Sequence, residues 1–243
     1  MNFAIYLAEL RMNTCVIESP CEHPDHKTNL SRFCDSSLLN KWNSFAQVRF
    51  NISLDPASVH FKYKNVQWMP FDSYDKPYYE MYNGIDIMRD QINAATYFDA
   101  ITIDMNSIDN YYIDNLTLSY LDEWWIVYDG DQHRFMESIN TITETFDLNI
   151  KLIVNKYNRF SEVDEIASLL GIKSEIIKVP NIFKSIQKNK TSNIPLINKP
   201  EGRYYLDKPF HEISTMFLGK DYINKFYRNP FYSIKKIKDF LNC

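Results

Sequence analysis

The stretch FDAITID, residues 98–104, decides the expected fold, because it is a short apolar run that ends on a carboxylate. A run of this length and composition is typical of a strand buried on both faces, as strands of parallel sheets are. A helical repeat of Ile85, Met88, Ile92 and Ala95 comes directly before it. We therefore predict a helix that leads into a buried strand, which is the basic unit of a parallel sheet.

Similar runs and repeats alternate on either side of this stretch. A helical repeat covers 2–11, and further helices are predicted at about 131–146 and after Ser161. Strands are expected at 13–18, 124–128, 150–154 and 175–179. Strands and helices in this order imply right-handed crossovers and a sheet covered on both faces. The predicted fold is a three-layer αβα domain with a mainly parallel sheet.

Polar side chains that follow the apolar runs are the candidate site residues, because ligands of parallel sheets bind at the carboxyl ends of the strands. Glu18, Asp104, Asp129 and Asn155 occupy these positions. Three of them have a structural alternative. Asp104 could cap a helix, Asn155 could start a turn, and Asp129 could belong to a turn before the next helix.

Glycine is scarce, and this limits the phosphate chemistry that the chain can perform. The chain has five glycines in 243 residues, and they do not cluster between a strand and a helix. A loop that cradles phosphates needs such a cluster, so that backbone N–H groups can approach the phosphate oxygens. The pair Gly219-Lys220 is followed by Asp221 instead of Ser or Thr. We find no glycine-rich phosphate loop in the sequence.

Composition excludes some classes of protein. A net charge of −4 gives no overall signal for nucleic-acid binding. No apolar run is long enough to span a membrane, and the amino end lacks the features of a secretory signal, so we expect a cytoplasmic protein. Cys21, His23, His26 and Cys34 have the side chains of a tetrahedral zinc site, but their spacing matches no common zinc pattern. We favour reduced thiols and a polar loop without zinc.

The chain is expected to form one α/β domain over 1–227, with an irregular insertion near 48–83 that includes short strands at 48–52 and 66–69. A carboxyl-terminal amphipathic helix is expected over 228–243. Within it, residues 231–241 place apolar side chains on one helical face and lysines on the other. Such a helix can lie on an anionic membrane surface, here the inner membrane surface, or dock on the sheet with its lysines in solvent. We favour docking.

A family resemblance covers most of 2–219. In order, the blocks NFAIYLAELRMNTCVIESP, FDAITIDMNS, DEWWIVYDGDQHRFMESI, LNIKLIVNKYNRFSEVDEIASLLGI and IIKVPNIFKS resemble successive blocks of the ParA/MinD family of deviant-Walker P-loop ATPases. The pilus-assembly branch, CpaE/TadZ-like, is the most similar in character. In the family, the helix that resembles 2–11 directly follows the Walker A loop. The resemblance therefore implies a P-loop NTPase-like fold in which the first strand and the P-loop are missing from this chain.

The resemblance also implies site residues, with ATP or ADP and Mg²⁺ as cofactors. Asp104 ends the strand that resembles Walker B and would hold Mg²⁺ through water. Asn155 matches the asparagine that reads adenine, and Pro180 matches the proline whose backbone lies against the base. Glu18 stands where the family usually has an aspartate of the first switch region. The segment 105–107 departs from the family pattern after Walker B, which puts the second switch in doubt.

The expected function rests on the residue pattern and on the family resemblance. We expect a ParA/MinD-like protein with a positioning, partitioning or assembly role, a protein partner, and weak or no ATP hydrolysis. Family members sandwich nucleotide between two copies, so a homodimer is an option. Two alternatives stay open. The chain could be a noncatalytic interaction module that docks a partner through Tyr74–Tyr82 and binds no nucleotide, or an amino-terminally truncated active ATPase.

Overall fold

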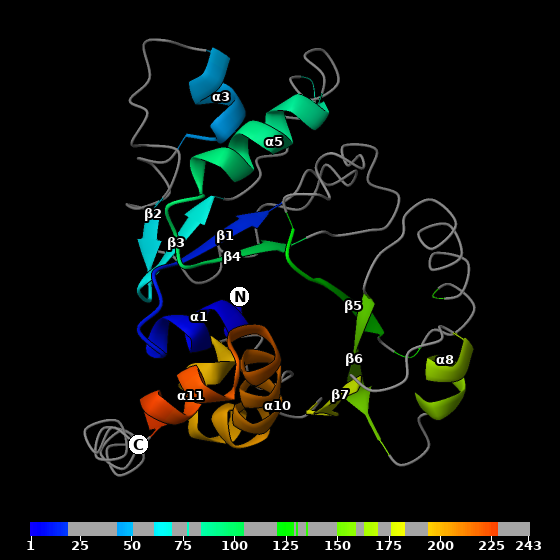
Figure 1. The fold of residues 1–243 in the computed structure, drawn as a ribbon. Helices are drawn as coiled ribbons and strands as arrows, with labels where there is room; N and C mark the ends of the chain where they lie inside the picture. Colours follow the sequence, from blue (N-terminus) through cyan, green and yellow to red (C-terminus); the bar gives the residue numbers. More distant parts are fainter. Residues whose placement is uncertain are drawn as a thin grey trace. The chain divides into compact units, whose positions relative to one another are not determined.

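The computed structural model describes residues 1–18, 43–50, 61–69, 77, 84–104, 121–128, 130, 135, 150–158, 163–169, 176–182 and 194–227. The chain divides into two compact units, Met1–Asp122 and Glu123–Cys243, and each unit has its own sheet (Figure 1). Both are α/β units whose strands are mainly parallel, as the apolar runs predict.

The sheet of the first unit has the strand order β2-β3-β1-β4. The central strand β1 (Thr14–Glu18) runs parallel to β3 (Val66–Met69) on one side and to β4 (Ala100–Asp104) on the other. All three strands were expected from their apolar residues. β1 lies inside the sheet, and every residue from Thr14 to Ile17 is buried.

A hairpin adds the antiparallel edge strand β2 (Phe61–Tyr63) to β3. Its turn residues Lys64 and Asn65 have φ of 52° and 62°. Positive φ at both central residues defines the hairpin turn whose twist matches that of the flanking strands. The pairing of β2 with β3 is the antiparallel part of an otherwise parallel sheet.

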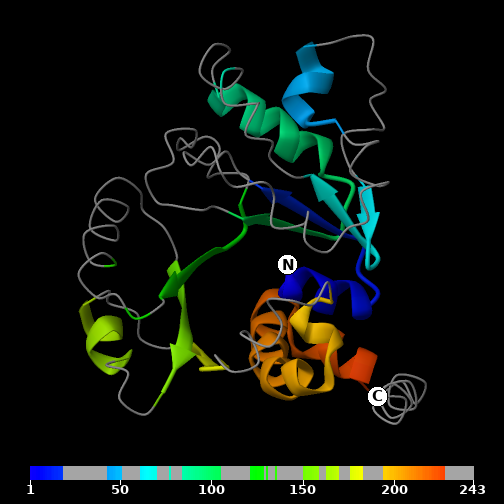
Figure 2. The ribbon, with the colours of Figure 1, turned by 180° about the vertical axis from the view of Figure 1, so that it is seen from behind.

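Helices cover both faces of the first unit's sheet. Successive side chains of a strand point to opposite faces, so Cys15 and Ile17 face one way and Val16 the other. Cys15 and Ile17 pack in one cluster with Ile92 of α5 (Gly84–Ala94). The helix α1 (Asn2–Glu9) contacts β1 and β3, and it lies on the side opposite α5 in both views (Figures 1 and 2). The first unit therefore has the predicted three layers.

One predicted strand is wrong. Residues 48–50, expected in a strand over 48–52, belong to the helix α3 (Phe45–Phe50). Its start is a capping box: the Gln47 backbone N–H donates to Ser44 Oγ (3.1 Å), and the Ser44 backbone N–H donates to Gln47 Oε1 (3.2 Å). These bonds satisfy two donors that a helix start would otherwise leave open, and they override the strand preference of the following residues. Arg49 also forms an ion pair with Asp90 of α5.

The second unit has three parallel strands in the order β5-β6-β7. They are β5 (Trp124–Tyr128), β6 (Ile150–Tyr157) and β7 (Ile176–Pro180). The helix α8 (Val163–Leu169) covers one face, where Val163 and Ile166 pack with residues of β5 and β6. Both parallel pairings and the position of β5 agree with the sequence-based prediction.

The long helix α10 (Pro200–Leu218) follows a short 3-10 turn, η4 (Leu196–Asn198), contacts β7 and is followed by α11 (Lys220–Tyr227). We did not predict these elements, although α10 carries two boundary signals. Pro200 stands in its first turn, and Gly219 ends it with φ of 82°. Proline at the start and glycine just past the end are typical of helices.

Several expectations concern residues outside those described. They include the zinc candidates Cys21, His23, His26 and Cys34, the tyrosines of 74–82, the segment 105–107, Asp129, and the helix expected over 228–243 with its membrane-facing segment 231–241. Among the described helices, none combines the length and the apolar character needed to cross a bilayer.

Candidate nucleotide and metal site

Two of the candidate carboxylates lie side by side in the first unit. Glu18 and Asp104 are the last residues of β1 and β4, and they are register partners in this parallel pair. Side chains of register partners emerge on the same face of a sheet, about 4.8 Å apart at the backbone. Glu18 is half-buried and Asp104 is exposed. The edge therefore presents two carboxylates in one direction, which is a local concentration of negative charge.

The start of α1 lies within electrostatic range of this pair. Burial lowers the pKa of the Met1 α-amino group, and the carboxylates of Asp104 and Glu18 act in the opposite direction. By parity, Glu18 lies on the same face of β1 as Val16, which is the face that α1 covers. Two carboxylates and the positive end of a helix thus meet at one edge of the first unit's sheet.

Carboxylate oxygens are the ligands that Mg²⁺ prefers, and the cation usually keeps several waters with one or two such ligands. The pair Glu18 and Asp104 fits this requirement in donor type and in number. Among the described residues, no group of three or more His, Cys, Asp or Glu side chains is arranged to hold a metal ion. A cation here would accordingly rest on two carboxylates together with water or substrate oxygens.

The other two candidates, Asn155 and Pro180, lie in the second unit at the carboxyl ends of β6 and β7. Tyr157 is the register partner of Pro180, and the pairing is irregular between Val154 and Tyr157. At this bulge Lys156 has φ of 56°, and its backbone N–H donates to Asn155 Oδ1 (3.0 Å). The β-bulge re-aims the end of β6, which is a common arrangement beside binding sites.

The bond from Lys156 to Asn155 also bears on the structural alternative for this asparagine. The Asn155 side chain supports a local turn of the backbone, as that alternative holds, and it is half-buried at the strand end. The left-handed Lys156 is a residue that our sequence reasoning did not single out. The Asn-Lys pair directly after an apolar run is the signal that could have indicated a bulge, because Asn is favoured where the backbone leaves a strand.

The four sequence-predicted residues thus form two pairs, one in each unit. Glu18 and Asp104 are neighbours across β1 and β4, while Pro180 ends β7 and Asn155 lies two residues before the end of the neighbouring strand β6. Each pair lies at the carboxyl edge of a parallel sheet, where ligands of α/β proteins bind.

The α/β fold with mainly parallel sheets is similar to solved structures of MinD and ParA proteins. Three solved structures represent the match. The MinD cell division protein of Aquifex aeolicus has a TM-score of 0.58 at 18% identity, over 86% of this chain and 87% of that one. A ParA family ATPase of Chlorobium tepidum has a TM-score of 0.61 at 18% identity, over 86% and 88%.

A putative plasmid partition protein of Borrelia burgdorferi, bound to AMPPNP, has a TM-score of 0.61 at 17% identity, over 90% of this chain and 92% of that one. No family model matches the sequence, and no curated protein matches it. At such low identities the likeness is one of fold, and it agrees with the fold that the sequence resemblance implies.

Proposed function

We propose that this chain is a ParA/MinD-like nucleotide-binding protein with a positioning, partitioning or assembly role. The observation that carries the proposal is the pairing of Glu18 with Asp104 at the carboxyl edge of a parallel sheet. The fold match supports it, because the matching structures include a cell division protein, a ParA family ATPase and a putative plasmid partition protein bound to AMPPNP.

In this proposal Asp104 holds Mg²⁺ through water, with Glu18 as the second carboxylate. The bound cation would offset the negative charge of a phosphate chain at this edge. Asn155 contacts the adenine through its side-chain amide, and the backbone beside Pro180 lies against the base. These roles come from the resemblance, and the strand-end positions of all four residues are compatible with them.

Hydrolysis by this chain is proposed to be weak or absent. The sequence contains no glycine-rich loop to donate backbone N–H groups to the phosphates. Such a loop and its lysine side chain donate charge-assisted hydrogen bonds to the phosphates. A single positioned arginine or lysine side chain can change the rate of phosphoryl transfer by about a thousandfold or more. The role would then lie in binding a protein partner, alone or as a homodimer, with nucleotide as a modulator. The pilus-assembly branch of the family is the proposed affiliation.

Isothermal titration with ATP and with ADP, each with Mg²⁺, tests nucleotide binding. We expect a dissociation constant in the micromolar range, about −8 kcal/mol. Asp104→Asn should weaken binding in the presence of Mg²⁺ and have much less effect when EDTA replaces the metal. Asp164→Asn, at an exposed position of α8, is the matched control and should bind like the wild type.

No heat at millimolar nucleotide would contradict the proposal and favour the interaction module that binds no nucleotide. Equal effects of Asp104→Asn with and without Mg²⁺ would contradict the metal role alone. Phosphate release at about 1 per second or faster, within the usual range of enzyme turnover, would contradict the proposal of weak hydrolysis.

A further inference from the structure

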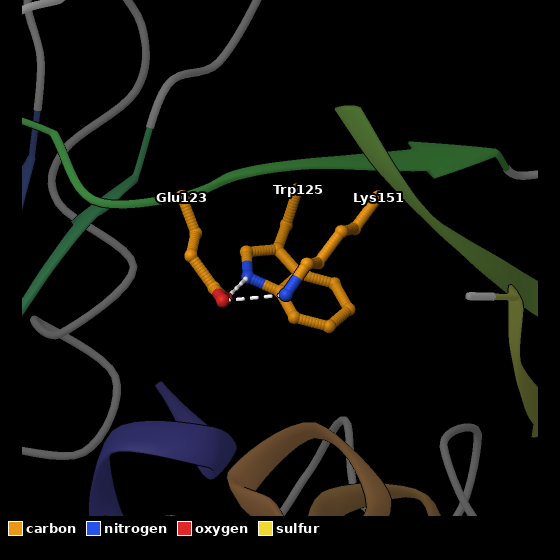
Figure 3. A network of polar contacts seen from close by, with 3 residues as sticks. All are labelled: Glu123, Trp125 and Lys151. Atoms are coloured by element: carbon orange, nitrogen blue, oxygen red, sulfur yellow. Dashed lines mark hydrogen bonds and ion pairs between the residues drawn. The ribbon is translucent and has the colours of Figure 1, made fainter. Parts of the chain in front are cut away.

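A buried charged network joins β5 to β6 in the second unit, away from the strand ends described above. Lys151 of β6 is 6% exposed, and its Nζ lies 2.5 Å from Glu123 Oε1. The Trp125 indole N–H donates to the other oxygen, Glu123 Oε2 (2.8 Å). Lys151 Nζ also lies 5.3 Å from the centroid of the Trp125 ring. Figure 3 shows the three side chains converging on one point.

The network lies on one face of the sheet. Trp125 and Lys151 are register partners, and Glu123 stands two residues before Trp125, so all three side chains share a face. The opposite face carries Ile126, Leu152 and Val154, which pack with α8. The ion pair thus lies on the face of the sheet opposite the hydrophobic cluster that packs with α8.

Hydrophobic pattern does not specify how β5 pairs with β6. The paired segments are WWIVY, residues 124–128, and IKLIV, residues 150–154. Lys151 is the one charged residue among these ten paired positions, and the other nine are aliphatic or aromatic. A strand that is apolar at every position can slip by one residue and still place apolar side chains on both faces. Register must be specified by something else.

We infer that the contact of Lys151 with Glu123 and Trp125 is a register lock for β5 and β6. A slip by one residue would move Glu123 and Lys151 to opposite faces of the sheet. A slip by two residues keeps them on one face: in one direction it would separate them by about 13 Å along the strands, and in the other it would place Glu123 directly opposite Lys151. The one-residue slip, and the two-residue slip that separates the pair, leave a buried ammonium without its carboxylate, which is the costly outcome for a buried charge.

The lock disfavours the one-residue slip and adds little net stability. Burying two charges costs free energy that their attraction in the interior only roughly offsets, so replacing both partners by neutral residues of similar volume is often close to neutral. Removing one partner is costly, because the remaining charge stays buried. The contact holds the amino-terminal half of β6, and the irregular pairing with β7 lies farther along the strand, between Val154 and Tyr157.

Disulfide trapping measures the register directly. Val127 and Ile153 are register partners on the face of the network, so Val127→Cys with Ile153→Cys reports the native pairing. The four native cysteines are replaced in the whole chain, and oxidation yield is measured by mass spectrometry. Val127→Cys with Val154→Cys reports a slip by one residue.

In the otherwise wild-type background we expect the native cross-link and only background amounts of the slipped one. In Glu123→Gln/Lys151→Met, which removes both charges, the native yield should fall by at least about twofold as slipped pairings become populated. Lys151→Arg keeps the charge and should keep the native yield. Native yield that is unchanged in the double variant would overturn the inference. Failure of the double variant to fold would overturn it too, since the pair would then supply net stability.

Discussion

Gly202 shows how closely the backbone packs where α10 meets η4. A Cβ atom at this position would lie 2.0 Å from the Leu196 carbonyl oxygen and 2.6 Å from Leu196 Cγ. The first of these contacts is with backbone, which cannot swing away as a side chain can. Gly202 lies inside the helix α10, so its backbone conformation does not demand glycine. The close approach of Leu196 does, because it leaves no room for a Cβ atom.

We expect Gly202→Ala to lower the free energy of unfolding by at least about 1–3 kcal/mol, because η4 and α10 must move apart. Urea denaturation followed by circular dichroism measures the change. Tyr204→Ala is the control, since this residue of the same helix is 80% exposed, and it should alter stability by less than about 0.5 kcal/mol. Equal stability of Gly202→Ala and wild type would show that the close approach does not exist in solution.

Cys15 gives a second prediction at this scale. Its thiol is fully buried in β1, and burial raises its pKa to about 12 from an ordinary value near 9.0. The unfolded chain ionises first as pH rises, so this thiol favours the unfolded state increasingly above pH 9. Its effect on stability is constant below that pH. Between about pH 9 and about pH 12, the free energy of unfolding should fall by about 1.4 kcal/mol per pH unit on account of this group.

Urea midpoints of the wild type and of Cys15→Ala, measured between about pH 8 and about pH 10, test the sign. The wild type should lose stability more steeply than the variant over this range, because the variant lacks the group that titrates in the unfolded state. Parallel pH profiles would show that the Cys15 thiol is not buried as described.

At the scale of elements, α3 illustrates how one local motif can decide a structure. Ser44 is buried, and it exchanges two hydrogen bonds with Gln47 across the first turn. The residues that follow, Val48 to Phe50, are compatible with a strand, which is why we predicted one. The capping box supplies the helix start that their own preferences do not.

Ser44→Ala should destabilise α3 by about 0.5–2 kcal/mol, because it removes the acceptor for the Gln47 backbone N–H. Hydrogen exchange of the amides of 45–50 measures the local effect, and exchange should speed up there. Gln47→Glu keeps an acceptor for the Ser44 N–H and should retain protection. If Ser44→Ala leaves exchange in α3 unchanged, the capping box does not stabilise the helix.

At the scale of the whole molecule, the chain divides into two compact units, and each contains a cluster of buried hydrophobic side chains. Ile17 belongs to a cluster with residues of β3, β4 and α5, and Leu152 belongs to a cluster with residues of β5 and α8. Both side chains are fully buried. Cooperative units of a protein often coincide with such compact bodies.

Ile17→Ala and Leu152→Ala should each cost about 2–5 kcal/mol, since each leaves a cavity in a well-packed cluster. We expect the loss of hydrogen-exchange protection to be greatest within Met1–Asp122 for the first variant and within Glu123–Cys243 for the second. Loss of protection spread evenly over both units in either variant would mean that the chain unfolds as a single cooperative body.

Local pattern was sufficient for most elements. The strand predicted at 124–128 has those bounds, and α1, α5 and β4 lie within about two residues of the predicted limits. The long helix α10 was missed because Pro209 inside it and its exposed tyrosines interrupt the usual pattern. The candidate site was predictable only as a set of strand-end residues, since their pairing depends on the order of the strands.

The sequence by itself determined most of the alternation of strands and helices and the carboxylates that end β1 and β4, because these depend on neighbouring residues and on the period of the apolar positions. Tertiary structure decided the order β2-β3-β1-β4, the pairing of Glu18 with Asp104, and the burial of Lys151 against Glu123. These contacts join residues far apart in the chain, and many pairings of similar apolar strands satisfy the same local pattern. Only packing and the cost of an unpaired buried charge distinguish among them.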